Sequence, residues 1–197
     1  SKAAEKSKLK LGEKNKDAIR FSCALAAFYL KMENLEKAEP LLRKCLENSL
    51  ASLGNKDPET INCFLNLGEL YCKKEDYEQA EPQYKKCLEL SIAAFTEKSE
   101  KTLEAYHNLA FVYDETEEYE KAMPLYKKCV ESSTQRHEEK STDTWKHQND
   151  LAEVYYNLDK YDLAEPLYAK ILEQTISTKG EKHIETAAAM FKLADMY

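Results

Sequence analysis

One stretch decides the fold of this chain: YDLAEPLY, at residues 161–168. Earlier versions of it read YEKAMPLY at 119–126, YEQAEPQY at 77–84 and LEKAEPLL at 35–42. Each copy begins 42 residues after the one before it, and no residue is inserted or lost between copies. A fixed period of this length is typical of arrays in which small helical units stack on one another.

The alignment at this period places two helices in every repeat. In the first helix, a leucine is followed directly by a small residue and, four positions after the leucine, by a tyrosine. Residues four apart share a helix face, and a small residue lets a neighbouring helix approach closely. We therefore predict a buried seam in a chain without β-strands. The residues expected to be almost fully buried are Leu67, Tyr71, Ala80, Leu109, Tyr113 and Ala122.

The predicted fold class is all-α, an α-α superhelix or solenoid that forms a single repeat array over residues 1–197. The array comprises a half repeat at 1–15, full repeats at 16–57, 58–99, 100–141 and 142–183, and a half repeat at 184–197. Neither end carries a polar capping helix, so we expect a segment of a longer protein. Uncapped ends also favour fraying and self-association.

Turn-forming residues recur where the helices are expected to end. A glycine at one phase of the repeat marks the end of the second helix, at Gly12, Gly54 and Gly180. Glycine adopts the left-handed conformation that ends helices easily. Asp57 and Pro58 are typical of an N-cap followed by proline at the first helical position. Ser99 and Ser141 are the expected caps where glycine is missing.

A proline also recurs about a turn and a half into each second helix. Proline inside a helix removes a hydrogen bond and clashes with the preceding turn. Because four prolines occur in phase, we predict an early kink that the helix tolerates rather than a helix end. They are Pro40, Pro82, Pro124 and Pro166.

The composition disfavours several classes of partner. The net charge is −7, whereas nucleic acid binding depends on Lys and Arg at the phosphates. No apolar run is long enough to cross a membrane. The first residues resemble neither a signal peptide nor a transit peptide. We therefore predict a cytoplasmic protein with no nucleic acid or membrane partner.

The six cysteines are predicted to be free core thiols in a reducing compartment. Cys45, Cys87 and Cys129 occupy one column of the repeat, and Ile171 takes that place in the last copy. A column that accepts either residue is a small apolar site. No cysteine has the CxxC or Cys/His spacing typical of zinc sites. We predict no metal site and no cofactor.

The columns carry a resemblance to a known family. Small-residue, tyrosine and alanine columns on paired helices are similar to the tetratricopeptide repeat over essentially the whole chain. The period of 42, the recurring Ala-Glu-Pro-Leu-Tyr-Lys-Lys-Cys-Leu-Glu pattern and the linker LGNKDP at 53–58 resemble the repeats of kinesin light chain. The resemblance implies a right-handed superhelix whose first helices line a concave groove for extended peptides.

The buried seam also locates the groove face. If Leu67, Gly68 and Tyr71 are buried, residues beside them at steps of three and four form an exposed stripe on each first helix. Amides in such a stripe pair with a peptide backbone, while aromatic and charged groups select ligand side chains. The candidate groove residues are Asn62, Asn66, Glu69, Lys73, His107, Asn108, Phe111, Lys146, Asn149 and Tyr156.

The resemblance implies that an asparagine directly before the column leucine holds the ligand backbone. Asn66 and Asn108 match this position, and Asp150 departs from it. The charge of the ligand stays open, because Lys73 and Lys146 favour an acidic ligand and four carboxylates favour a basic one. These carboxylates are Asp114, Glu115, Asp150 and Glu153.

The predicted function is a non-catalytic scaffold or adaptor that binds a linear peptide of a partner protein, with cargo recognition as in kinesin light chain as one form. One alternative is a structural array that only self-associates. Another is a cochaperone that grips a C-terminal carboxylate, but Leu65, Glu69 and Asp150 stand where its basic cluster would lie. No catalytic residues are predicted, because Cys72 and His107 would lie roughly 10 Å apart, too far for a thiolate pair.

Overall fold

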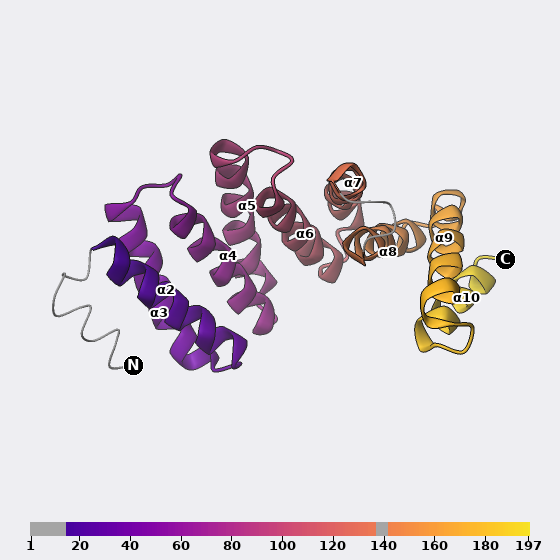
Figure 1. Cartoon of the computed structure of the whole chain (residues 1–197), viewed down its shortest axis with the longest axis horizontal. Coiled ribbons are helices and arrows are strands. Elements are labelled where there is room, and N and C mark those ends of the chain that lie inside the picture. Colours follow the sequence, from indigo (N-terminus) through magenta and orange to yellow (C-terminus); the bar gives the residue numbers. More distant parts are fainter. Residues whose placement is uncertain (1–14, 137–141) are drawn as a thin grey trace. The chain divides into compact units, whose positions relative to one another are not determined.

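The computed structural model describes residues 15–136 and 142–197, and within these ranges the chain is helical and contains no β-strand (Figure 1). The helices are α2 (Lys16–Lys31), α3 (Leu35–Ser52), α4 (Pro58–Lys73), α5 (Tyr77–Ala94), α6 (Glu100–Glu115), α7 (Tyr119–Arg136), α8 (Thr142–Asn157), α9 (Tyr161–Lys179) and α10 (Ile184–Asp195). The all-α fold class is therefore confirmed. The expected caps Gly12 and Ser141 lie outside the described residues. Among the helices described, none combines the length and the apolar character that crossing a membrane requires.

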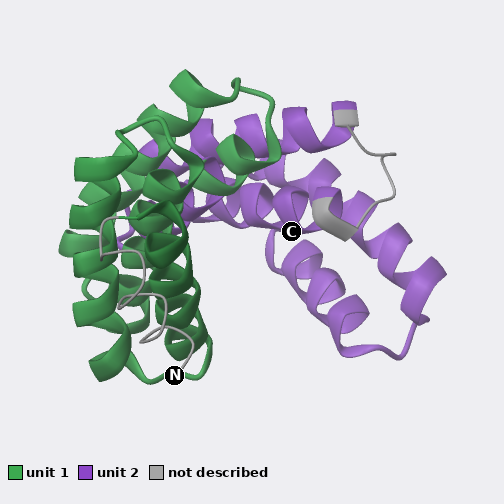
Figure 2. Ribbon diagram, turned by 60° about the vertical axis from the view of Figure 1, so that its left-hand side comes forward, with its two compact units in different colours: residues 1–105 green, residues 106–197 purple. Residues whose placement is uncertain are grey.

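The chain forms two compact units, unit 1 at residues 1–105 and unit 2 at residues 106–197 (Figure 2). In unit 1, α2 packs on α3 and α4 packs on α5, while α4 also contacts α3 and α2. In unit 2, α8 packs between α7 and α9, and α10 packs on α9. Packing between helices that follow one another in the chain is typical of a repeat array.

The buried seam lies where the repeats predict it. The predicted residues are at most 6% exposed: Leu67, Tyr71, Ala80, Leu109, Tyr113 and Ala122. Gly68 shows why the column requires a small residue. A Cβ atom on Gly68 would lie 2.5 Å from the Tyr84 ring, so the helices could not approach as closely with a side chain there.

The turn inside each repeat was not predicted from the sequence. One acidic residue in each turn has a left-handed backbone, with φ between 55° and 59°. These residues, at one phase of the repeat, are Glu33, Glu75, Glu117 and Asp159. The next residue donates its N–H to the carbonyl of the column tyrosine, as from Asp76 to Tyr71 at 2.9 Å. This bond satisfies a carbonyl at the helix end and offsets the cost of a left-handed residue with a side chain.

The linkers between repeats follow the predicted glycines and caps. Gly54 and Gly180 have φ values of 86° and 88°. The Asp57 carboxylate accepts the N–H of Glu59 at the start of α4. Ser99 Oγ accepts the N–H of Thr102 at 3.2 Å, at the start of α6. These predictions are confirmed.

A buried threonine fixes the same linkers and was missed in the sequence. In three linkers the threonine hydroxyl donates to a linker carbonyl six residues earlier. The pairs are Thr60 with Gly54 at 2.8 Å, Thr102 with Thr96 at 2.7 Å, and Thr186 with Gly180 at 2.9 Å. The buried threonine hydroxyl thereby gains a partner, and the linker carbonyl is held by the fold.

The helices continue through the repeated proline. The four prolines lie inside α3, α5, α7 and α9, and each is exposed to solvent: Pro40, Pro82, Pro124 and Pro166. Proline is therefore tolerated in these helices without ending them, as predicted.

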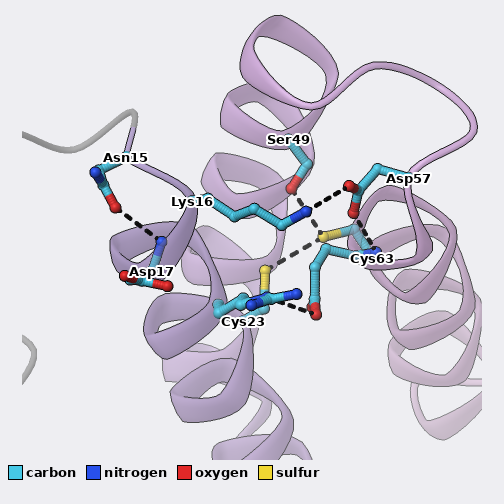
Figure 3. Close-up of polar contacts among 9 residues, drawn as sticks. Asn15, Lys16, Asp17, Cys23, Ser49, Asp57 and Cys63 are labelled. Atoms are coloured by element: carbon cyan, nitrogen blue, oxygen red, sulfur yellow. Dashed lines mark hydrogen bonds and ion pairs between the residues drawn. The ribbon is translucent and has the colours of Figure 1, made fainter.

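The six cysteines, all within the described residues, are free thiols as predicted. Cys23 of α2 and Cys63 of α4 lie with their Sγ atoms 3.4 Å apart, and Ser49 Oγ lies 3.7 Å from the Cys63 sulfur (Figure 3). With Ile19 and Cys45 the two cysteines form one apolar cluster, here named the closed core of unit 1. The hydrogen bond with Cys23 and burial raise the pKa of Cys63, so this thiol stays protonated at neutral pH. Within the described ranges, no group of three or more His, Cys, Asp or Glu residues is arranged to hold a metal ion.

Candidate functional site

In unit 1 the candidate groove residues lie along α4. Asn62, Asn66 and Glu69 are partly exposed, and Lys73 is exposed. The Lys73 ammonium lies 3.8 Å from the Glu33 carboxylate, so a neighbouring helix end already shares its charge. The α4 surface therefore offers two amides and two groups of opposite charge to solvent.

In unit 2 the candidate groove residues lie on α6 and α8, and all of them reach the surface. Phe111 and Lys146 are exposed, while the partly exposed members are His107, Asn108, Asn149 and Tyr156. His107 does not extend freely into solvent, because its Nε2 atom lies 2.9 Å from Oδ2 of Asp150. The His107 ring also packs edge-on against Tyr126, with centroids 5.7 Å apart. These contacts join α6, α7 and α8 by polar and aromatic side chains.

Carboxylates crowd around Asp114 at the end of α6. Burial raises the pKa of Asp114 to about 6. The charges of Asp150, Glu115 and Glu153 add to this rise, and a hydrogen bond from the Tyr126 hydroxyl opposes it. Because ionisation is disfavoured here, a cation placed beside Asp114 would be stabilised.

A cavity of about 820 Å³ lies between α8, α9 and α10 of unit 2. Two candidate groove residues, Lys146 and Asn149, line it together with Glu153, one of the carboxylates that favour a basic ligand. The apolar part of its lining consists of Trp145, Ile171, Ala188 and Ala189. A concave, largely apolar site with a few polar groups is typical of ligand pockets.

Two residues of α9 that line this cavity, Tyr168 and Gln174, carry buried polar atoms. Gln174 Oε1 has no hydrogen-bond partner in the described ranges, and the Tyr168 hydroxyl lies near Glu153. The Tyr168 side chain is 1% exposed, and burial together with the Glu153 charge raises its pKa, so the phenol stays protonated. A buried polar atom without a partner costs free energy, which a hydrogen-bonding ligand would recover.

Tyr156 is covered by side chains of α10. The Lys192 ammonium lies 4.4 Å from the centre of the Tyr156 ring, and the Tyr156 hydroxyl donates to the Asp195 carboxylate. Lys192 also pairs with Glu153 at 3.0 Å. These contacts bridge α8 and α10 beside the cavity.

Trp145, Tyr168 and the alanines of α10 line the cavity but were not predicted from the sequence as site residues. Trp145 is the single tryptophan of the chain and stands four residues before Asn149. Residues at this spacing share a helix face, so the pattern that selected Asn149 could have found Trp145. Tyr168 is the last residue of the repeated stretch YDLAEPLY, and its side chain lies in the core.

Comparison with known families agrees with the repeat columns. The model of the tetratricopeptide repeat family matches residues 18–93, 64–135 and 144–197. The chain belongs to the tetratricopeptide repeat family. Proteins of this family generally mediate protein–protein interactions, and their fold is typically a non-catalytic interaction scaffold.

Solved structures similar to this tetratricopeptide repeat chain include kinesin light chain-like proteins. The putative kinesin light chain repeats of Podosopora anserina are 18% identical, with a TM-score of 0.77 over 91% of this chain and 85% of that chain. BtubC (BKLC) of P. vanneervenii is 21% identical, with a TM-score of 0.78 over 100% and 78%. The apo form of RapI is 18% identical, with a TM-score of 0.78 over 98% and 74%. Such similarity shows the fold alone. No curated protein sequence matches the chain.

Proposed function

We propose that this tetratricopeptide repeat array is a non-catalytic adaptor that binds an extended peptide of a partner protein on its first-helix face. The cavity of unit 2 carries the proposal, because the candidate groove residues Lys146 and Asn149 line it. Its volume of about 820 Å³ lies within the range of ligand-binding pockets.

The groups around the cavity suit a peptide. The Asn149 amide can both donate to and accept from a peptide backbone, while the apolar walls can hold one ligand side chain. Asn66 and Asn108 supply further amides on α4 and α6. Recognition of cargo in the cytoplasm, as the likeness to kinesin light chain repeats suggests, is the form of this function that we favour. Six free thiols suit a reducing compartment.

Selection from a random dodecapeptide library displayed on phage tests the proposal. We expect enriched peptides that bind the wild-type chain and lose about 1–3 kcal/mol of binding free energy in an Asn149→Ala variant, because a ligand backbone group loses its partner. Lys121→Glu on the exposed surface of α7 is the control and should leave the affinity unchanged. A selection that enriches nothing would contradict the proposal.

Self-association is a second candidate, because two helices expose large apolar side chains. Phe28 of α2 is 57% exposed, Met32 directly after α2 is 64% exposed, and Phe191 of α10 is 68% exposed. Exposed apolar clusters often mark interaction surfaces. Light scattering over a concentration series decides this point: a mass that rises with concentration supports self-association, and a constant monomer mass excludes it.

A further inference from the structure

The geometry points to a peptide ligand of mixed aromatic and basic character. One aromatic side chain fills the cavity between α8, α9 and α10, and a lysine or arginine lies beside the carboxylates of Asp114, Asp150 and Glu153. This inference rests on the proposed function and specifies the chemistry of its ligand, a segment of a partner protein.

The cavity occupies repeat positions that form closed core in unit 1. Trp145, Asn149, Ile171 and Ala189 stand three periods after Ile19, Cys23, Cys45 and Cys63, the closed core of unit 1. The equivalent positions one period after that core, Ile61, Cys87 and Ala105, are closed as well. Apolar walls without atoms opposite them lose dispersion contacts. A ligand side chain inserted between α8 and α10 therefore gains the contacts that the other interfaces already have.

The polar atoms of the cavity select the kind of side chain. Tyr168 and Gln174 line the cavity, and Gln174 Oε1 is buried without a hydrogen-bond donor among the described residues. The Tyr168 hydroxyl has the Glu153 carboxylate as a neighbour, which raises its pKa. An aromatic side chain with an O–H or N–H group fills the apolar space beside Trp145 and can also donate a hydrogen bond to the polar lining, whereas an aliphatic side chain can only fill the space.

The charges beside the cavity favour a cation. Four carboxylates interact beside the cavity: Asp114, Glu115, Asp150 and Glu153. They outnumber the basic side chains Lys146, Lys192 and His107, even when His107 is counted as a cation. Lys192 already pairs with Glu153, and His107 with Asp150. Asp114 forms no ion pair with any residue that the structure describes, and a hydrogen bond from the Tyr126 hydroxyl lowers its pKa against the effect of burial and of the three carboxylates.

Glu153 joins the two parts of the proposed site. Its side chain lines the cavity, and its charge acts on Asp114. A short segment can therefore place an aromatic residue in the cavity and a cation beside Asp114 at the same time. A cation at Asp114 would form a charge-assisted hydrogen bond in a partly buried place, where such bonds are strong.

Two matched pairs of variants separate the two contacts. Ala188→Phe fills the cavity from its wall, whereas Ala187→Phe adds the same ring at the neighbouring exposed residue, which does not line the cavity. Asp114→Asn removes a carboxylate from the crowded group, whereas Glu120→Gln removes one from the exposed surface of α7. Thermal melting by circular dichroism establishes that each variant is folded.

The phage selection on the wild-type chain comes first. Enriched peptides that combine a tyrosine or tryptophan with a nearby lysine or arginine support the inference. Enriched peptides that are acidic, or that lack an aromatic residue, overturn it and leave the proposed function standing. The absence of any enriched peptide overturns both.

The best synthetic peptide, labelled with fluorescein, is then titrated by anisotropy. We expect Ala188→Phe to raise Kd about tenfold or more and Asp114→Asn to raise it about threefold to tenfold, with each control within about twofold of wild type. An unchanged Kd in Ala188→Phe, or equal effects within either matched pair, would place the ligand elsewhere and overturn the inference.

Discussion

The closed core of unit 1 and the cavity of unit 2 occupy the same repeat positions but differ in closure. In unit 1 the sulfurs of Cys23 and Cys63 lie 3.4 Å apart, and α2 packs directly on α4. In unit 2 the equivalent residues Asn149 and Ala189 line a cavity of about 820 Å³. The period of the sequence therefore determines which residues face an interface, but not how tightly the interface closes.

Side-chain size does not explain the difference. Trp145 is larger than its equivalent Ile19, and Ile171 is larger than Cys45, yet both border the cavity. Only Ala189 is smaller than its equivalent, Cys63. The cavity therefore reflects where α10 lies relative to α8 on their shared partner α9.

The largest expected effect is the loss of a core side chain in unit 1. Ile19→Ala should lower the free energy of unfolding by roughly 2–5 kcal/mol, because Ile19 is almost fully buried and the closed core cannot collapse around the hole. Ile171→Ala, which removes the same groups beside the cavity, should cost less, about 1–2 kcal/mol. Urea denaturation of both variants measures the difference. Equal losses would show that the two interfaces are equally closed.

Adding volume at equivalent positions should have effects of opposite sign. Cys63→Leu forces extra atoms into the closed core and should destabilise the chain by about 1–3 kcal/mol. Ala189→Leu places the same side chain in the cavity and should stabilise by roughly 0.5–2 kcal/mol. Thermal melting compares each variant with wild type. A destabilised Ala189→Leu would mean that the cavity is too narrow to accept a side chain.

The smallest expected effect concerns charge at another pair of equivalent positions, Cys72 in unit 1 and Asp114 in unit 2. The pKa of Asp114 is raised from 3.8 to about 6, so between these values the folded state binds more protons and stability falls as the pH rises. Asp114→Asn should therefore stabilise the chain at pH 7, by about 1 kcal/mol after allowance for solvent screening of a half-exposed group.

The gain from Asp114→Asn should fade as the pH falls through about 6 and should be lost at about pH 3, below both pKa values, where the Asp114 carboxyl is protonated in the folded and in the unfolded state. The melting temperatures of the wild type and of Asp114→Asn, compared at pH 7 and at the lower pH, measure this gain in stability. A gain that does not change with pH would assign the effect to packing rather than to charge.

Features that recur in every repeat could be predicted from the sequence, whereas features that depend on how the helices fit together in three dimensions could not. Leu109 and Tyr113 were assigned to the seam correctly, because residues at the same position of successive repeats are buried to a similar degree. Glu75 was not assigned a left-handed backbone, since propensity favours glycine there and the hydrogen bond from Asp76 that compensates becomes visible only in the structure. The position of Ala188 in the wall of the cavity was missed for a similar reason, because it depends on where α10 lies.

The left-handed turns also bear on how such a chain can grow by duplication of its coding sequence. The hydrogen bonds of each turn, such as Asn34 to Tyr29 and Lys37 to the Asn34 side chain, lie within one helix pair. A duplicated unit of 42 residues therefore brings its complete turn with it and requires nothing from its neighbours. A duplication of another length would break this bond only where its junction falls between the tyrosine and its donor. Selection for intact turns would therefore preserve the turn inside each copy even while the residues on the first-helix surface diverge.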